Sequence, residues 1–134
     1  MKYLLDTNIC IYLIKSKPPQ VLQKFQAHSV GEIGISAITV AELQFGVQKS
    51  QYVEQNQHAL QQFLLPLICA PFDDLAAAAY GEIRATLEAQ GTPIGSLDTL
   101  IAAHALSLDV ALVTNNTREF SPVPNLKVVN WIDG

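Results

Sequence analysis

The sequence predicts a three-layer α/β fold, in which a parallel β-sheet lies between two layers of helices. Short apolar segments recur along the chain, and stretches with helical spacing of apolar residues separate them. Strands that alternate with helices favour a parallel sheet joined by right-handed crossovers. Of the 134 residues, 49% are apolar and 15% are charged, so the chain can bury a core without a cofactor or disulfide.

The elements follow from local patterns in chain order. The apolar segments have the length of buried strands, and they are KYLL (2–5), EIGI (32–35), LICA (67–70), VALVT (110–114) and LKVV (126–129). Helical patterns between them predict helices over 8–16, 20–28, 37–49, 52–65, 74–90 and 97–108. The last helix has an apolar stripe that predicts its buried face, formed by Leu97, Leu100, Ile101, Ala105 and Leu108.

The loop motifs and the N-terminal segment indicate how many domains the chain has and where the protein is expected to be located. Gly91-Thr92-Pro93 and Pro122-Val123-Pro124 mark loops rather than domain boundaries, so we predict a single domain over residues 1–134. Asp6 interrupts the first apolar run, which therefore resembles neither a signal peptide nor a membrane span. A cytoplasmic location is the expectation, and Cys10 and Cys69 are predicted to be buried thiols.

The formal net charge of −4 argues against binding nucleic acid through bulk electrostatics. A nucleic acid partner would require a local basic rim or bound cations. The candidate basic contacts are Lys15, Lys17, Lys49, Arg84 and, most strongly, Arg118. His104 lies on the apolar stripe of its helix and is predicted to be a core histidine rather than a ligand.

Two aspartates occur at element boundaries. Asp6 directly follows the first predicted strand, in YLLDTN, where capping of the next helix is an alternative role. Asp98 falls in the first turn of a predicted helix that Ser96 could cap, so stabilisation by the helix dipole is its alternative role. Taken singly, each aspartate is explained by its local structural role.

Two glutamates have comparable structural alternatives. Glu42 follows Thr39 by three residues, as in a capping box, and Glu119 follows Asn116 with the same spacing. However, in a parallel sheet the carboxyl ends of the strands lie along one edge, where ligands bind. The four acids could converge there, and a hard divalent cation would relieve their repulsion.

Four motifs in sequence order resemble those of PIN-domain ribonucleases, and specifically the VapC toxins of bacterial toxin–antitoxin pairs. They are YLLDTNICIYLIK, ISAITVAELQFG, GTPIGSLDTLIAAHAL and LVTNNTREF, which together span nearly the whole chain. The resemblance implies a five-stranded parallel sheet flanked by helices and a Mg²⁺- or Mn²⁺-dependent endoribonuclease site. It also implies that Asp6 and Asp98 bind the metal and that Glu42 helps to complete the acidic pocket.

The resemblance further implies partners and a substrate. The TNNTREF ending resembles the branch of VapC toxins that cut initiator tRNA in the anticodon loop, so tRNA is the favoured substrate. The family implies a homodimer, held inactive by a VapB antitoxin that inserts a segment near the catalytic groove. Because VapB also binds operator DNA, a higher-order toxin–antitoxin complex is expected.

One departure from the family pattern lies after the fourth strand. Many PIN domains have an aspartate where this chain has Asn115 and Asn116. Neutral amides add no negative charge, so Glu119 is the predicted substitute and Asn116 is predicted to position water or phosphate. Besides these catalytic candidates, the predicted substrate contacts are Thr7, Asn8, Asn115 and Arg118.

Two alternative functions remain open on the sequence. A phosphohydrolase using a strand-end aspartate as nucleophile would need a second acid two residues after Asp6, or an aspartate ending the third strand. The chain has Asn8 and Ala70-Pro71 at these places. A degenerate PIN-like dimer that acts only as a binding partner is the non-enzymatic alternative.

Overall fold

The computed structural model describes residues 1–132 and confirms the predicted parallel sheet. Its strands are β1 (Tyr3–Leu5), β2 (Ile33–Ser36), β3 (Ile68–Ala70), β4 (Ala111–Val113) and β5 (Val128–Val129). All neighbouring pairs are parallel, in the order β3-β2-β1-β4-β5. Each strand lies within one residue of the predicted segment, apart from β5, which retains only its last two residues.

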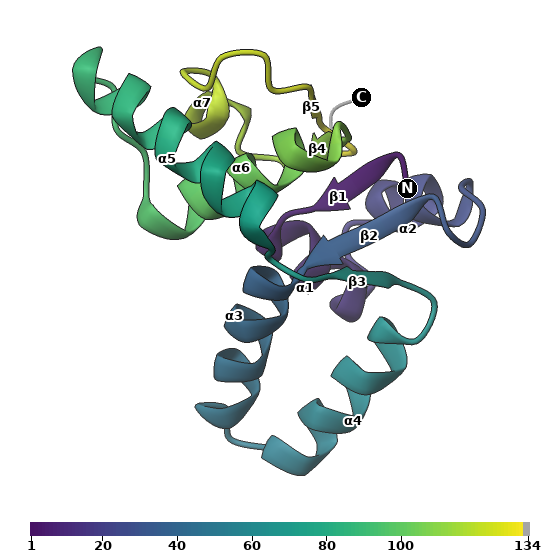
Figure 1. Ribbon diagram of the computed structural model, residues 1–134. Coiled ribbons are helices and arrows are strands. Elements are labelled where there is room, and N and C mark those ends of the chain that lie inside the picture. The colour runs from purple at the N-terminus through teal and green to yellow at the C-terminus, as the bar shows by residue number, and fades with distance from the viewer. Residues whose placement is uncertain (133–134) are drawn as a thin grey trace.

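Six helices of the described residues agree closely with the predicted ranges, and a short seventh helix lies outside them. These helices are α1 (Thr7–Lys15), α2 (Pro19–Gln26), α3 (Ala37–Gln48), α4 (Val53–Leu64), α5 (Asp74–Ala89), α6 (Ser96–Leu108) and the short α7 (Thr117–Phe120). Figure 1 shows α3 and α4 side by side below the sheet, with α5 and α6 packed together above it. None of these helices has the length and apolar character required to cross a membrane.

The alternation of side chains along the strands produces two core clusters. Leu5 and Val113 pack with residues of α1, α2, α3 and α4 on one face of the sheet. Leu4 and Leu112, one residue earlier in the same strands, pack with α5, α6 and α7 on the other face. Successive strand residues point to opposite faces, so the two clusters form the three layers that the sequence predicted.

Two burial predictions were wrong. Cys69 is exposed because it lies on β3, the edge strand of the sheet, whereas Cys10 is buried as predicted. The predicted stripe on α6 is also displaced, since Leu97 and Leu108 are exposed by 46% and 37%. The helix is instead buried through a broader face, made by Thr99, Ile101, Ala102, Ala103, His104 and Ala105. Small alanines let α5 and α6 pack closely, so the bulky leucines do not define the contact.

Candidate active site

Asp6 lies at the carboxyl end of the central strand β1 and is only 5% exposed. Its backbone N–H donates to the Val113 carbonyl oxygen over 3.0 Å, which extends the β1–β4 pairing. Its Oδ1 accepts the Ile9 N–H over 2.9 Å and caps α1. Asp6 therefore does cap α1, as its alternative role required. The cap uses Oδ1, so Oδ2 can still bind a ligand at this edge of the sheet.

The strand order explains why this position is open. The chain proceeds from β1 outward to β2 and β3 on one side, and β4 and β5 lie on the other side. Connections leaving β1 and β4 therefore diverge, and the carboxyl ends of two such strands border a crevice in open α/β sheets. Asp6 follows β1, and Thr114 and Asn115 follow β4, at this crevice.

Glu42 approaches the crevice from α3. The Thr7 hydroxyl donates to Glu42 Oε1 over 2.7 Å, so the residue that follows Asp6 holds this glutamate in place. The capping box, which was the alternative role for Glu42, does not form, because α3 begins at Ala37 and Ser36 is its N-cap. Glu42 therefore lies inside the helix, and its carboxylate is directed by Thr7 rather than by a helix end.

Asp98 and Glu119 approach from the side of α6 and α7. Glu119 Oε1 accepts the Gly95 N–H over 3.1 Å, a bond that joins residues 24 apart in the chain. Gly95 is the N-cap of α6, and Asp98 lies in the first turn of that helix. Capping by Ser96 is therefore wrong, since Ser96 is the first helical residue. The predicted capping box at α7 is wrong as well, since Asn116 makes no side-chain cap and Glu119 bonds to Gly95 instead.

The pKa of Asp98 indicates that the four acids share one electrostatic site. Burial raises this pKa from 3.8 to about 6, and the charges of Glu119, Asp6 and Glu42 add to the increase in that order. Burial also raises the pKa of Asp6, assisted by the charge of Glu42 and opposed by hydrogen bonds from Thr114 and from the Ile9 N–H. The charges of three acids from separate segments thus reach Asp98, and the catalytic roles assigned to the four acids stay predictions.

The residues predicted to contact the substrate follow β1 and β4, and they differ in how exposed their side chains are. Asn115 donates through Nδ2 to the Tyr12 hydroxyl over 3.1 Å, and its Oδ1 is buried without a hydrogen-bond partner among the described residues. Asn116, Arg118 and Asn8 are exposed. The exposed side chains remain available to a ligand, whereas Asn115 is fixed by Tyr12 and presents an unused acceptor.

Two groups at the site were not among the predicted residues. The Thr114 hydroxyl is fully buried, hydrogen-bonds Asp6 and also accepts the Asn116 N–H over 2.9 Å. Gly95 has no side chain and contributes only its backbone N–H, so its residue type gave no sign of the bond to Glu119. Thr114 had a signal, since it stands between the fourth strand and the asparagines in LVTNN.

His104 lies against Ser36 at the start of α3 rather than in the acidic site. It is 1% exposed, and its Nδ1 lies 2.7 Å from the Ser36 hydroxyl oxygen. Burial lowers the pKa of His104, which favours the neutral imidazole. The prediction of a core histidine is confirmed, and the Ser36 contact connects α6 to the start of α3.

The donor chemistry of the acidic site fits a hard divalent cation. Within residues 1–132, no three carboxylate, imidazole or thiol groups are close enough to enclose an ion on their own. Mg²⁺ and Mn²⁺ accept such an open arrangement, because they keep several waters and need only one or two direct carboxylates. The raised pKa of Asp98 reflects repulsion that a bound cation would relieve.

Replacing Asp98 with asparagine should stabilise the metal-free protein by about 1 kcal/mol near neutral pH. Because the pKa of Asp98 rises to about 6 on folding, its ionised carboxylate opposes folding above that pH. The penalty declines as the pH falls and is lost below the ordinary pKa. We expect the difference in unfolding free energy, measured in urea with EDTA, to shrink from about pH 7.5 to about pH 4. A difference that does not vary with pH would contradict the raised pKa.

Comparison with known proteins assigns this architecture to a family. A family model described as the PIN domain matches residues 3–126. A Shigella flexneri protein named tRNA(fMet)-specific endonuclease VapC is 43% identical over 131 residues, which cover 98% of each chain. A Haemophilus influenzae protein named Ribonuclease VapC2 is 45% identical over 132 residues, covering 98% of this chain and 99% of the relative.

A solved structure agrees with the sequence relatives. The crystal structure of VapBC2 from Rickettsia felis, bound to a DNA fragment from the promoter, contains a chain that matches with a TM-score of 0.92. The two chains are 44% identical, and the match covers 98% of this chain and 99% of the other. Sheet, helices and chain length therefore correspond throughout.

Proposed function

Because this chain belongs to the PIN-domain family and to its VapC branch, we propose that it is a metal-dependent endoribonuclease toxin. Its relatives are named as ribonucleases and endonucleases over almost the full length of both chains. The observation that supports this most strongly is that the charges of Glu119, Asp6 and Glu42 all raise the pKa of Asp98. Oxygen donors at the carboxyl edge of the sheet suit phosphodiester cleavage assisted by Mg²⁺ or Mn²⁺.

The four acids have separate roles in this proposal. Asp6 and Asp98 hold the cation, which when bound would supply Lewis-acid chemistry at the phosphate. Glu42, oriented by the Thr7 hydroxyl, positions the attacking water. Glu119 supplies the negative charge that Asn115 and Asn116 lack.

The exposed residues around the acids contact the substrate. Asn116 positions water or a phosphate oxygen, and Arg118 offers its guanidinium to the phosphate backbone. Thr7, Asn8 and Asn115 complete the proposed set of substrate contacts. These residues follow β1 and β4, so the RNA backbone would cross the crevice between the two strands.

Transfer RNA is the proposed substrate, with the anticodon loop of initiator tRNA favoured. The support is the name of the Shigella flexneri relative, which is 43% identical. The purified protein should be incubated with total tRNA and Mg²⁺ or Mn²⁺, and the ends of the products sequenced. We expect new ends concentrated in one anticodon loop. Ends scattered over many RNAs would contradict tRNA selectivity while leaving ribonuclease activity in place.

A VapB-type antitoxin is the proposed partner, because the solved relatives include toxin–antitoxin complexes. An apolar groove of about 390 Å³ runs between α1, α3 and α4, and Thr7 and Glu42 lie among its lining residues. An antitoxin segment lying in this groove would reach the catalytic acids. We also propose that the toxin is a homodimer, so the complex would have higher order, which light scattering can measure.

Replacing Gly46 with leucine should weaken antitoxin binding by at least about tenfold, or about 1.4 kcal/mol. Gly46 lines the groove, and a Cβ at this helical position would meet nothing within 4 Å. A leucine side chain would therefore project into the groove without disturbing the fold. Calorimetric titration with a VapB-type antitoxin measures the change.

Gly46→Ala is the matched control for this substitution. It makes the same gain in helix propensity, about 1 kcal/mol over glycine, but adds only a methyl group. Antitoxin affinity should stay near that of the wild type. Equal affinity of Gly46→Leu and the wild type would place the antitoxin segment elsewhere.

Metal binding distinguishes the proposed ribonuclease from the non-enzymatic alternative, a degenerate dimer. A degenerate dimer should show no stabilisation by Mn²⁺, whereas a native-state metal site must raise the melting temperature when its ligand is added. The phosphohydrolase alternative remains disfavoured, since Asn8 and Ala70-Pro71 occupy the positions where it would need acids. Transfer of phosphate to Asp6 from a small phosphodonor would revive it.

A further inference from the structure

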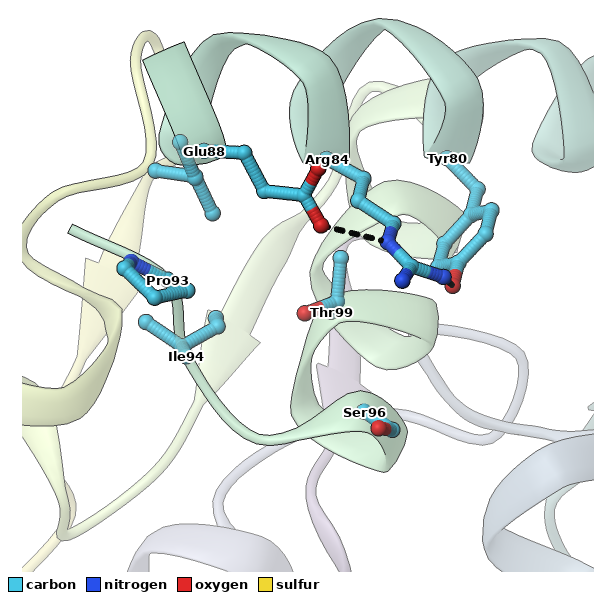
Figure 2. A pocket seen from close by; sticks show the side chains of 8 residues that line it. Tyr80, Arg84, Glu88, Pro93, Ile94, Ser96 and Thr99 are labelled. Carbon is cyan, nitrogen blue, oxygen red and sulfur yellow. Dashed lines mark hydrogen bonds and ion pairs between the residues drawn. The ribbon is translucent and has the colours of Figure 1, made fainter. Parts of the chain in front are cut away.

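A second hollow lies against the first turn of α6, the helix that carries Asp98, and none of the roles proposed above uses it. It has a volume of about 170 Å³ and lies between α5 and the segment that leads into α6. Figure 2 shows side chains of α5 facing the start of α6 and the preceding loop. Its main lining residues are Tyr80, Arg84, Glu88, Pro93, Ile94 and Ser96.

Arg84 is held over this hollow by two neighbours on its own helix. Its Nη1 donates to the Tyr80 hydroxyl over 2.9 Å, and its Nε donates to Glu88 Oε1 over 3.0 Å. Figure 2 shows the guanidinium directed toward α6. A guanidinium has five N–H donors, so a ligand in the hollow can still be bound by those that these two bonds leave.

The opposite wall of the hollow is fixed to the acidic site. The Thr99 hydroxyl donates to the Gly95 carbonyl oxygen over 2.8 Å, and the Gly95 N–H donates to Glu119. Ser96, which lines the hollow, and Asp98 are two residues apart in the first turn of α6. These two residues point to opposite sides of the helix, so the hollow and the acids lie one helix diameter apart, roughly 10 Å, which a single RNA strand can span.

We propose that this hollow, the Arg84 pocket, binds one unpaired nucleobase of the RNA whose phosphate is cleaved at the acids. The inference rests on the proposed ribonuclease function. Arg84 supplies hydrogen-bond donors and Glu88 supplies an acceptor. The edge of a nucleobase carries both acceptors and donors, which can pair with them. Leu87, Pro93 and Ile94 supply apolar walls for a base face.

The lining favours a base over a phosphate. A phosphate presents only acceptors and a negative charge, so the Glu88 carboxylate would repel it. The volume also suits a small planar group, because pockets for larger ligands are about 300–1,000 Å³. Single-stranded RNA is commonly recognised by unstacked bases that contact arginine planes and aromatic rings.

The test compares cleavage by the wild type and by Arg84→Gln on tRNA transcripts randomised at the nucleotides that flank the cut. We expect the wild type to prefer certain bases at one flanking position. Arg84→Gln should reduce that preference by about tenfold, because a good base-edge contact has about this effect. Preferences at the other positions should not change. A preference that persists in Arg84→Gln would overturn the Arg84 pocket.

Lys127→Gln is the matched control, because Lys127 also forms an exposed ion pair, with Asp109 over 3.3 Å. It removes the same charge outside the pocket and should keep the base preference. Equal losses in both variants would assign the effect to net charge and overturn the proposal. Melting temperatures near the wild-type value for both variants would confirm that they fold, as expected for exposed pairs.

An abasic nucleotide distinguishes a base from a phosphate. Synthetic anticodon stem–loop RNA lacking the base at the preferred position should bind the wild type about tenfold more weakly. Arg84→Gln should bind the abasic and intact RNAs equally. If Arg84→Gln weakens binding of both RNAs to the same degree, Arg84 contacts a phosphate and the base pocket is wrong. A wild-type protein that cleaves no RNA would instead refute the proposed function itself.

Discussion

Replacing Asp6 with asparagine should lower metal-dependent RNA cleavage by about 100- to 1,000-fold while the protein remains folded. Asparagine keeps the side-chain oxygen that accepts the Ile9 N–H, and it caps helices as well as aspartate does. The substitution therefore removes the negative charge but preserves the cap. Initial rates on tRNA, with thermal melting of the same samples, measure both effects.

Asp73→Asn is the matched control for this prediction. Asp73 caps α5 through the Ala76 N–H over 3.0 Å, in the same way that Asp6 caps α1. It is exposed and lies outside the acidic site, so its replacement should leave the cleavage rate unchanged. Full activity of Asp6→Asn would show that the strand-end aspartate is only a helix cap.

Replacing Glu119 with glutamine should lower cleavage by about 10- to 100-fold, as the loss of a supporting group at a metal site typically does. The glutamine oxygen can still accept the Gly95 N–H that Glu119 now accepts over 3.1 Å. The α6–α7 connection is thereby retained, and only the charge is lost. The measurement is the cleavage rate on tRNA, with Glu54→Gln on α4 as a control in an exposed glutamate.

The same variant has a second readout that a structural role would not change. After burial, the charge of Glu119 is the largest cause of the raised pKa of Asp98. In the metal-free Glu119→Gln protein, the pKa of Asp98 should therefore fall toward its ordinary value, as followed by NMR of its carboxyl carbon. If the variant cleaves RNA as fast as the wild type, the site works with three acids.

The fold was largely predictable because the strands and helices have distinct local patterns. β1 and β4 are short apolar runs bounded by polar residues, and their register follows from parallel pairing. The prediction that failed for Cys69 depended on which strand lies at the sheet edge, which hydrophobicity alone does not reveal. The buried face of α6 was also misassigned, because its close packing on α5 is made by alanines.

Two acids of the site were predictable from their positions at element ends, but the orientations of the two glutamates were not. Asp6 and Asp98 occur at a strand end and a helix start, which sequence patterns identify. Glu42 and Glu119 have carboxylates directed by Thr7 and Gly95, at separations of 35 and 24 residues. Such bonds depend on the tertiary fold, so local rules assigned both glutamates to capping boxes that do not form.

The two asparagines after β4 are each held by a hydrogen bond to a hydroxyl group. Asn115 is fixed by the Tyr12 hydroxyl, and the Asn116 N–H is bound by the buried Thr114 hydroxyl. Thr114 also bonds to Asp6, so the end of β4 holds the carboxylate of β1 in position. The segment that lacks an acid therefore still organises the site through its hydroxyl and amide groups.

The most direct test of the metal-dependent site is cleavage of total tRNA by the purified protein under three conditions. They are Mg²⁺ present, EDTA added, and Mg²⁺ restored in excess, with Asp6→Asn measured in parallel. We expect the wild type to cleave only when Mg²⁺ is available, and Asp6→Asn to cleave at least about 100-fold more slowly even with Mg²⁺. Cleavage that persists both in EDTA and in the Asp6→Asn variant would contradict a metal-dependent site built on these acids.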